Sequence, residues 1–309
     1  MKPGFSTIKN MLLHGLEKAG YTLVPIDKCR PVDLRHASDS LLDLSYRFPS
    51  RQLLINAPLN AGVSYLDYPL GIVESLSPTI RKAYDTPGQE KALLREGLRQ
   101  FYAAWQPANA AEFFKLDPDQ AQALGELPAW LSCWPWDHRD PERLRIARER
   151  RKPQARGDAT SWGPKATIDF KWKFCGPITE ERLDAEVQRM ARLVCSIRRQ
   201  GYCRHDNGDG DIRAAVLICS DGSWRWFAYS GQHRQAIARV LMGDRVPIRV
   251  ISFVRRNEVA HWPGVTSGLF DEPAALHVFD DFFRCSSRRS ADRCQMMARW
   301  PEGRRRQRP

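Results

Sequence analysis

The sequence lacks two features that would assign it to a familiar class at once, a long hydrophobic run and a pair of closely spaced cysteines. No apolar stretch approaches the roughly 18 residues that a membrane-spanning helix needs. The N-terminal segment has no continuous hydrophobic stretch followed by a small-residue cleavage site, so we expect no secretion signal. The expectation is therefore a protein without a membrane span, located in the cytoplasm.

The eight cysteines form no Cys-x-x-Cys pair, and several fall inside predicted helices or strands. We interpret them as reduced, mostly buried thiols, which excludes a disulfide framework and a zinc site and leaves no predicted metal ligands.

Positive charge is concentrated at one end of the chain. The net charge is +12, but residues 284–309 contain nine arginines against Asp292 and Glu302, a net of +7. The rest of the chain therefore carries only +5, which is ordinary for its size. We expect this Arg-rich tail to be disordered and to be a candidate for nonspecific contact with nucleic acid.

A chain of 309 residues is long enough for two domains, and the composition changes near residue 158. We predict a mostly helical α+β N-terminal region at 1–138 and a basic linker at 139–158. An α+β domain with a mixed sheet and a C-terminal helix follows at 159–283, and the tail covers 284–309. In the first part we expect helices at 7–19 and 91–105, a buried strand at 52–58, and an irregular Trp- and Pro-rich segment at 127–137.

The chain is organised around residues 213–253. The pattern predicts strands at 213–219 and 223–229, a helix at 232–241 and a strand at 246–253. Gly231 would then join a strand to a helix N-terminus, where unpaired N–H groups can hold a phosphate or carboxylate. The alternative is a tight turn with two exposed polar residues, His233 and Arg234.

A second helix precedes this stretch, after a predicted strand at 166–174. Thr179 is a plausible N-cap, apolar residues then recur every three to four positions, and Gly201 ends the helix. Glu180 and Glu181 occupy the first turn, where the helix dipole favours acidic side chains.

The motifs Ser196-Ile197-x-x-x-Gly201, Asp221-Gly222, Gly231-x-His233-Arg234 and Val246-Pro247, in this order, resemble the ParB/sulfiredoxin superfamily. The resemblance covers residues 166–255. The whole chain is also similar to bacterial proteins in which a ParB-like domain follows a distinct N-terminal half.

The sulfiredoxin branch implies a nucleotide site. Its loop binds ATP phosphates, which would place the ligand at Gly231, Gln232, His233 and Arg234. Its long helix contacts the nucleotide at positions that fall here on Arg189, Arg192 and Ser196; the alternative is a solvated arginine face. Gln232 replaces the branch's reactive Cys, and a carboxamide cannot act as that nucleophile, so sulfiredoxin chemistry is not expected.

The free-serine kinase branch implies an acidic general base near the helix start, with Glu180 or Glu181 as the candidates. Ser230 stands where that branch has an Asp, and both glutamates have the alternative role of first-turn acids. The resemblance therefore implies a protein that binds ATP or another nucleotide with Mg²⁺, with phosphotransfer to a small molecule or glycan precursor as a candidate activity. The alternative is a noncatalytic, nucleic-acid-associated regulator of ParB-like type.

Overall fold

The structure is a computed structural model that describes residues 30–37, 40–69, 75–119, 121–137, 142, 174–203 and 211–284. The predictions for 7–19, for the linker apart from residue 142, for 166–173 and for the tail beyond residue 284 lie outside these residues.

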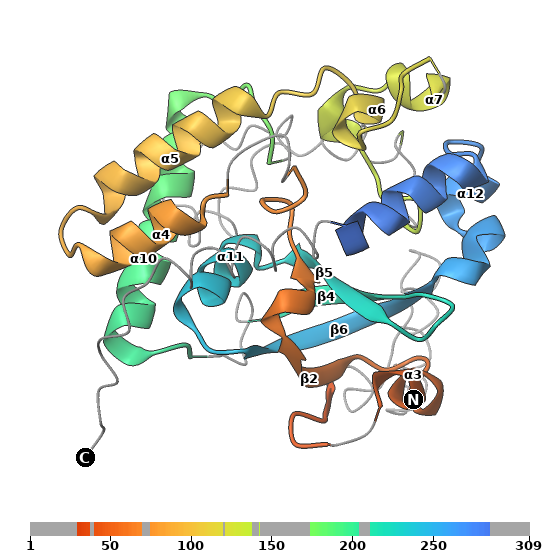
Figure 1. The fold of residues 1–309 in the computed structure, drawn as a ribbon, viewed down its shortest axis with the longest axis horizontal. Helices are drawn as coiled ribbons and strands as arrows, with labels where there is room; N and C mark the ends of the chain where they lie inside the picture. The colour runs from red at the N-terminus through yellow and green to blue at the C-terminus, as the bar shows by residue number, and fades with distance from the viewer. Residues whose placement is uncertain are drawn as a thin grey trace, which may run out of the picture.

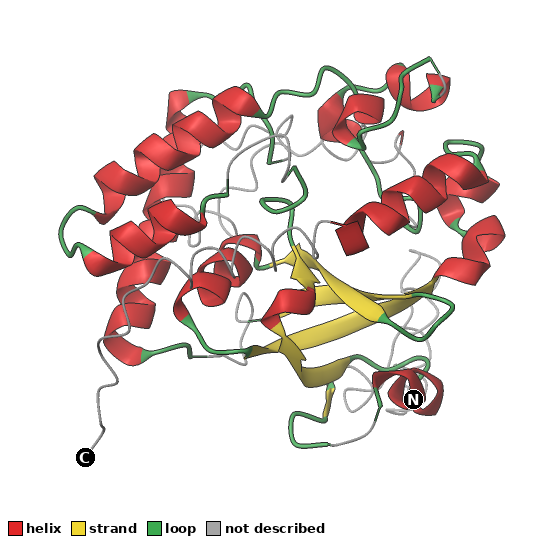
Figure 2. Ribbon diagram, viewed as in Figure 1, coloured by secondary structure: helices red, strands yellow, loops and turns green. Residues whose placement is uncertain are grey.

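A mixed sheet of six strands forms the centre of the fold (Figures 1 and 2). Its order is β1-β2-β6-β4-β5-β3. The strands are β1 (Val32–Asp33), β2 (Leu53–Pro58), β3 (Gly62–Val63), β4 (Ile212–Ile218), β5 (Trp224–Ser230) and β6 (Arg245–Arg255). β4 pairs antiparallel with β5 and parallel with β6.

Helices cover both faces of the sheet, so the chain belongs to the α+β class as expected. In Figure 1, α4, α5, α10 and α11 lie on one side and α3 on the other. Their bounds, with those of the shorter helices, are α3 (Leu41–Arg47), α4 (Ser77–Asp85), α5 (Glu90–Ala104), α6 (Ala110–Phe113), α7 (Gln122–Gly125), α10 (Glu180–Gln200), α11 (Gln232–Leu241), α12 (Pro263–Thr266), and the 3₁₀ turns η1 (Leu59–Ala61), η2 (Ala129–Leu131) and η3 (Arg256–His261). A further helix covers residues 272–284. No helix within the described ranges is long and apolar enough to cross a bilayer.

The helix α10 begins and ends where its sequence signals predict. Thr179 Oγ1 accepts a hydrogen bond from the backbone N–H of Arg182 at 3.3 Å, and Gly201 ends the helix with a φ of 70°. Leu183, Val187 and Met190 are buried on one side, so the apolar repeat is the face that packs inward.

The strand β4 is buried on both faces, because its apolar residues alternate between two cores. Ala215 and Leu217 belong to the larger core, with α4, α5 and α10. Ala214 and Val216 belong to the smaller core, with α3. Such burial explains the nearly continuous apolar run of this strand.

Segments from the N-terminal half complete this sheet. β2 pairs antiparallel with β6, with Asn56 opposite Pro247, and β3 pairs parallel with β5. The described residues of the N-terminal half therefore pack into the same sheet and cores as residues 174–284, whereas the sequence had led us to expect a separate N-terminal region. The boundary near residue 158 lies outside the described residues and stays a prediction.

The Trp- and Pro-rich segment is held onto the sheet by its indole rings, as predicted. The Trp134 side chain is only 1% exposed, and its ring stacks on Trp136 with the centroids 5.9 Å apart. The Pro135 carbonyl accepts a hydrogen bond from Gly264 N–H at 2.7 Å, which joins this segment to α12. Asp137 follows Trp136 directly in the sequence, so the packing of the Trp-rich segment also fixes the position of Asp137 above the sheet.

Candidate functional site

The junction between β5 and α11 has the predicted strand-to-helix geometry. Gly231 lies between them with φ 79° and ψ 27°, a left-handed conformation that favours glycine. A Cβ atom at this position would lie 3.1 Å from Ile212 Cα and 3.2 Å from the Asp211 carbonyl oxygen. Both the backbone conformation and the close approach to β4 therefore require a glycine here.

Gln232, the first residue of α11, points into the protein. Its Oε1 accepts a hydrogen bond from Tyr65 N–H at 2.9 Å, and its Nε2 donates to the Ala228 carbonyl. The residue is only 4% exposed. The amide therefore ties the end of β5 to the segment that follows β3.

His233 is also buried, and its ring faces α10. Its Nε2 contacts Glu186 Oε2, and Arg182 Nη2 lies 3.0 Å from the other oxygen of the same carboxylate. The Phe174 ring lies against the imidazole with a centroid distance of 5.9 Å. The sequence interpretation missed Glu186, although its place one turn after Arg182 is visible in the sequence.

Electrostatics in this cluster favour the ionised carboxylate. Burial by itself raises the pKa of Glu186, but the charges and hydrogen bond of His233 and the charge of Arg182 outweigh it, and the pKa is lowered. Burial, with the charge of Glu186, raises the pKa of Tyr102 well above its usual value. The cluster therefore combines an ion pair within α10 with a buried polar contact between α10 and α11.

The remaining residues of the predicted nucleotide site lie on these same two helices. Arg189 and Ser196 are half-buried on α10, Arg192 is exposed there, and Arg234 is half-buried on α11. The positive charge of Arg189 acts on Glu186. An adenine and ribose site along this helix stays a prediction.

Glu180 lies at the outer surface between α10 and α5. Its carboxylate pairs with Arg95, and with Arg99 at 3.4 Å. Glu181 is exposed. These positions fit the interpretation of both glutamates as first-turn acids, with an ionic link to α5 in the case of Glu180.

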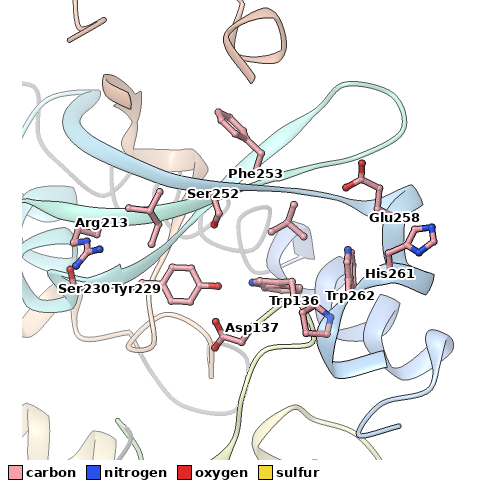
Figure 3. Close-up of a pocket in the computed structure, with 13 residues that line it drawn as sticks. Trp136, Asp137, Arg213, Tyr229, Ser230, Ser252, Phe253, Glu258, His261 and Trp262 are labelled. Carbon is pink, nitrogen blue, oxygen red and sulfur yellow. The ribbon is translucent and has the colours of Figure 1, made fainter. Parts of the chain in front are cut away.

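A pocket of about 720 Å³ opens over one face of the sheet and reaches the junction at Ser230 (Figure 3). We call it the sheet pocket. Its wall comes from β4, β5, β6, η3, the start of α12 and the Trp-rich segment: Trp136, Asp137, Arg213, Tyr229, Ser230, Ile251, Ser252, Phe253, Val254, Glu258, His261, Trp262 and Pro263. Of these residues, the sequence analysis singled out only Ser230 as part of a candidate site.

Arg213 and Ser230 are direct partners across β4 and β5. The register of β4 shifts between Arg213 and Ala214 against β5, and between Ala214 and Ala215 against β6. Such β-bulges re-aim side chains and are common beside active sites. Arg213 is exposed and takes part in none of the ion pairs among the described residues.

Tyr229 lies between Arg213 and Trp136 in the sheet pocket, with its hydroxyl near Asp137 (Figure 3). Burial, followed by the negative charge of Asp137, raises the pKa of Tyr229 well above its usual value. The hydroxyl therefore keeps its proton at neutral pH, beside the Asp137 side chain.

Within the described parts of the chain, no three His, Cys, Asp or Glu side chains are placed to hold a metal ion. These residues do not fit a Mg²⁺ site built from protein ligands. Comparison with protein-family models, curated proteins and solved structures found no match to this chain.

Proposed function

We propose that this protein binds a small phosphate-bearing molecule of nucleotide size in the sheet pocket. The observation that carries the proposal is the exposed Arg213 guanidinium beside Ser230, at a bulge in β4. Arginine presents several N–H donors in a planar fork that matches a phosphate, and a serine hydroxyl can donate one more.

The size and lining of the sheet pocket support this ligand class. A volume of about 720 Å³ lies within the range of roughly 300–1,000 Å³ that is usual for small-molecule sites. Trp136, Tyr229 and Trp262 give the wall aromatic surface, and a few polar groups interrupt it. Such a wall suits an organic molecule with a ring and an anionic group better than a bare inorganic ion.

The proposed ligand class includes the nucleotide that the resemblance to the ParB/sulfiredoxin superfamily implies. The elements β4, β5, α11 and β6 follow in the order of that family's motifs. We assign the anion contact to Arg213 and Ser230, because the imidazole of His233 is buried against Glu186. Phosphotransfer is not part of the proposal, since Glu180 pairs with Arg95 and Arg99 on the outer surface.

The test is the effect of Arg213→Ala on the binding of AMP, ATP and CTP, measured by isothermal titration calorimetry. A lost hydrogen bond to a charged group is worth about 1.5–3 kcal/mol, so Kd should rise by roughly 10- to 150-fold. Arg47→Ala is the matched control, because Arg47 is exposed on α3, which packs on the other face of the sheet. The control should bind like the wild type.

Arg192→Ala separates the two locations that have been considered for the ligand. If the nucleotide lay along α10, as the resemblance implies, Arg192→Ala would weaken binding and Arg213→Ala would not. That result, or wild-type affinity in the Arg213→Ala protein, would contradict the proposed site.

A further inference from the structure

An extra residue in β6 decides which side chains of this strand face the sheet pocket. Ala214 of β4 is paired with Val250 and Ala215 is paired with Ser252, so Ile251 is inserted between two successive pairs. An inserted residue reverses the alternation of side chains along the strand beyond it. The bulge therefore places Ser252 on the opposite face from the one that an unbroken alternation would give it.

The burial of the side chains along β6 shows this reversal. Before the bulge, Val246 and Val250 belong to the smaller core. Beyond the bulge, Val254 belongs to the larger core, although it too has an even number. Ser252 shares the face of Val254 and lines the sheet pocket, and in Figure 3 Ser252 and Phe253 point to opposite sides of the strand.

The hydroxyl of Ser252 is available to a ligand. The residue is half-buried in the wall of the pocket, and its hydroxyl makes no hydrogen bond with any of the residues that the structure describes. A polar group that is withdrawn from water is unfavourable without a hydrogen-bond partner. A ligand that fills the pocket must therefore offer this hydroxyl a partner in place of solvent.

Ser252 lies beside the anion-binding end of the pocket, which Arg213 and Ser230 form. Arg213 and Ala215 are alternate residues on one face of β4, and Ser252 is the neighbour of Ala215 in β6. Strands lie about 4.8 Å apart and alternate residues roughly 6.6 Å apart along a strand, so the Cα atoms of Arg213 and Ser252 are separated by roughly 8 Å. In Figure 3, Ser252 lies between Arg213 on one side and Trp262 on the other.

This order matches the parts of a nucleotide. A phosphate group at the anion-binding end and a ring against Trp262 leave the sugar between them, beside Ser252. A serine hydroxyl and a sugar hydroxyl can each donate and accept a hydrogen bond, so the two groups match in either direction. A second phosphate group would match Ser252 less well, because charged donors are its stronger partners.

We infer that Ser252 binds a sugar hydroxyl of the ligand and makes the sheet pocket selective for sugar phosphates over their deoxy analogues. This inference rests on the proposed function and narrows its ligand class to phosphate esters with free hydroxyl groups. Ser252 is then a specificity-determining residue, and the insertion of Ile251 is the structural cause of its position.

The experiment compares AMP with 2′-deoxy-AMP and 3′-deoxy-AMP, each of which lacks one hydroxyl group. Kd is measured by isothermal titration calorimetry on the full chain, for the wild type, Ser252→Ala, Ser252→Thr, Arg213→Ala and the control Ser50→Ala. Threonine keeps the hydroxyl and is favourable in a strand. Ser50 is exposed and does not line the pocket. The melting temperature of each variant shows whether it is folded, and the comparison of the three ligands on the wild type needs no variant.

The wild type should bind AMP roughly 2- to 13-fold more tightly than at least one deoxy analogue, as expected for one hydrogen bond between neutral groups. The analogue that binds more weakly identifies the hydroxyl. The preference should disappear in Ser252→Ala and persist in Ser252→Thr and Ser50→Ala.

Equal affinities of the wild type for the three ligands, or a preference that survives in Ser252→Ala, would overturn the inference. An equal loss of affinity for all three ligands in Ser252→Ala would also overturn it, because that result would place the Ser252 hydroxyl on the phosphate. A preference that Ser252→Thr loses as well would assign the effect to packing and not to the hydroxyl.

The Arg213→Ala protein keeps the two proposals distinguishable. If it binds the three ligands as tightly as the wild type, the proposed anion site is wrong, and the Ser252 contact is decided by the sugar preference alone. If it binds all of them weakly and the wild type shows no sugar preference, the anion site stands and the role inferred for Ser252 is wrong. No binding of any of the three ligands to the wild type would overturn both.

Discussion

The imidazole of His233 lies against the carboxylate of Glu186 in the interior, although the two residues are 47 positions apart in the chain. Glu186 is completely buried, and Arg182 pairs with it from the preceding turn of α10. This contact joins α10 to α11 two residues after Gly231. The side chain of His233, which the sequence suggests as a ligand contact, is thus buried between α10 and α11 and is not among the residues that line the sheet pocket.

Glu186→Gln should destabilise the protein by about 3–5 kcal/mol at pH 7, because it leaves the buried charge of Arg182 without its counter-charge. The measurement is the free energy of unfolding in urea. Glu181→Gln is the control, since Glu181 is exposed on the same helix and its loss should cost less than about 0.5 kcal/mol. Equal stability of the two variants would show that the ion pair contributes little.

Glu90 should give the protein an acid-dependent contribution to stability. Its pKa is lowered from 4.5 to about 2, chiefly by the hydrogen bond from the Arg198 guanidinium. The unfolded state binds this proton at higher pH than the folded state, so the stabilisation is complete above pH 4.5 and is lost as the pH falls toward 2.

Between about pH 5 and pH 3, the unfolding free energy of Glu90→Gln should therefore fall less steeply than that of the wild type. Glu96→Gln, on an exposed position of the same helix, should leave the wild-type slope unchanged. The two slopes are compared by urea unfolding at several pH values. A Glu90→Gln slope equal to that of the wild type would rule out this contribution.

Gln232→Leu should cost about 2–5 kcal/mol, because it leaves the Tyr65 N–H and the Ala228 carbonyl without their partner in a buried place. A Gln232→Cys protein, which carries the sulfiredoxin residue, should lose a similar amount, since a thiol cannot reach both groups. Thermal unfolding measures the effect. Gln200→Leu, on an exposed position at the end of α10, is the control and should be close to neutral.

Gly231→Ala should destabilise the protein by about 1–3 kcal/mol and weaken ligand binding in the sheet pocket. The left-handed backbone conformation is unfavourable for an alanine, and its Cβ atom would come too close to Ile212 and the Asp211 carbonyl. Gly243→Ala is a matched comparison, because a Cβ atom there meets nothing within 4 Å. A stability of Gly231→Ala equal to that of Gly243→Ala would contradict the strain expected at the junction.

Local patterns in the sequence predict the elements around Gly231 well. The helix over 232–241 has the expected bounds, and β4, β5 and β6 begin and end within two residues of the predicted positions. These elements are recognisable because their periodicity, their turn residues and the N-cap of α10 act over a few neighbouring positions. The same patterns could not place β2 beside β6, because pairing between distant strands leaves no local signal.

The candidate site was only partly predictable for the same reason. Helix-start residues such as Gln232 and His233 are often exposed, and only the long-range packing of Tyr65 and Glu186 shows that these two are covered. Asp137 precedes Arg213 by a long stretch of chain, and nothing in the spacing unites them. The Asp that follows a Trp-Pro-Trp sequence was the one available hint of a fixed polar side chain.

The place of β2 in the sheet has a consequence for the order of events during synthesis. The Arg245 side chain at the start of β6 donates to the Asn56 carbonyl, 189 residues away. When β2 leaves the ribosome, its partner strand has not been made, and the closure of so long a loop is slow. During synthesis, β2 therefore stays without its neighbouring strand until β6 has been made, and an unpaired strand edge is a template for association with other chains.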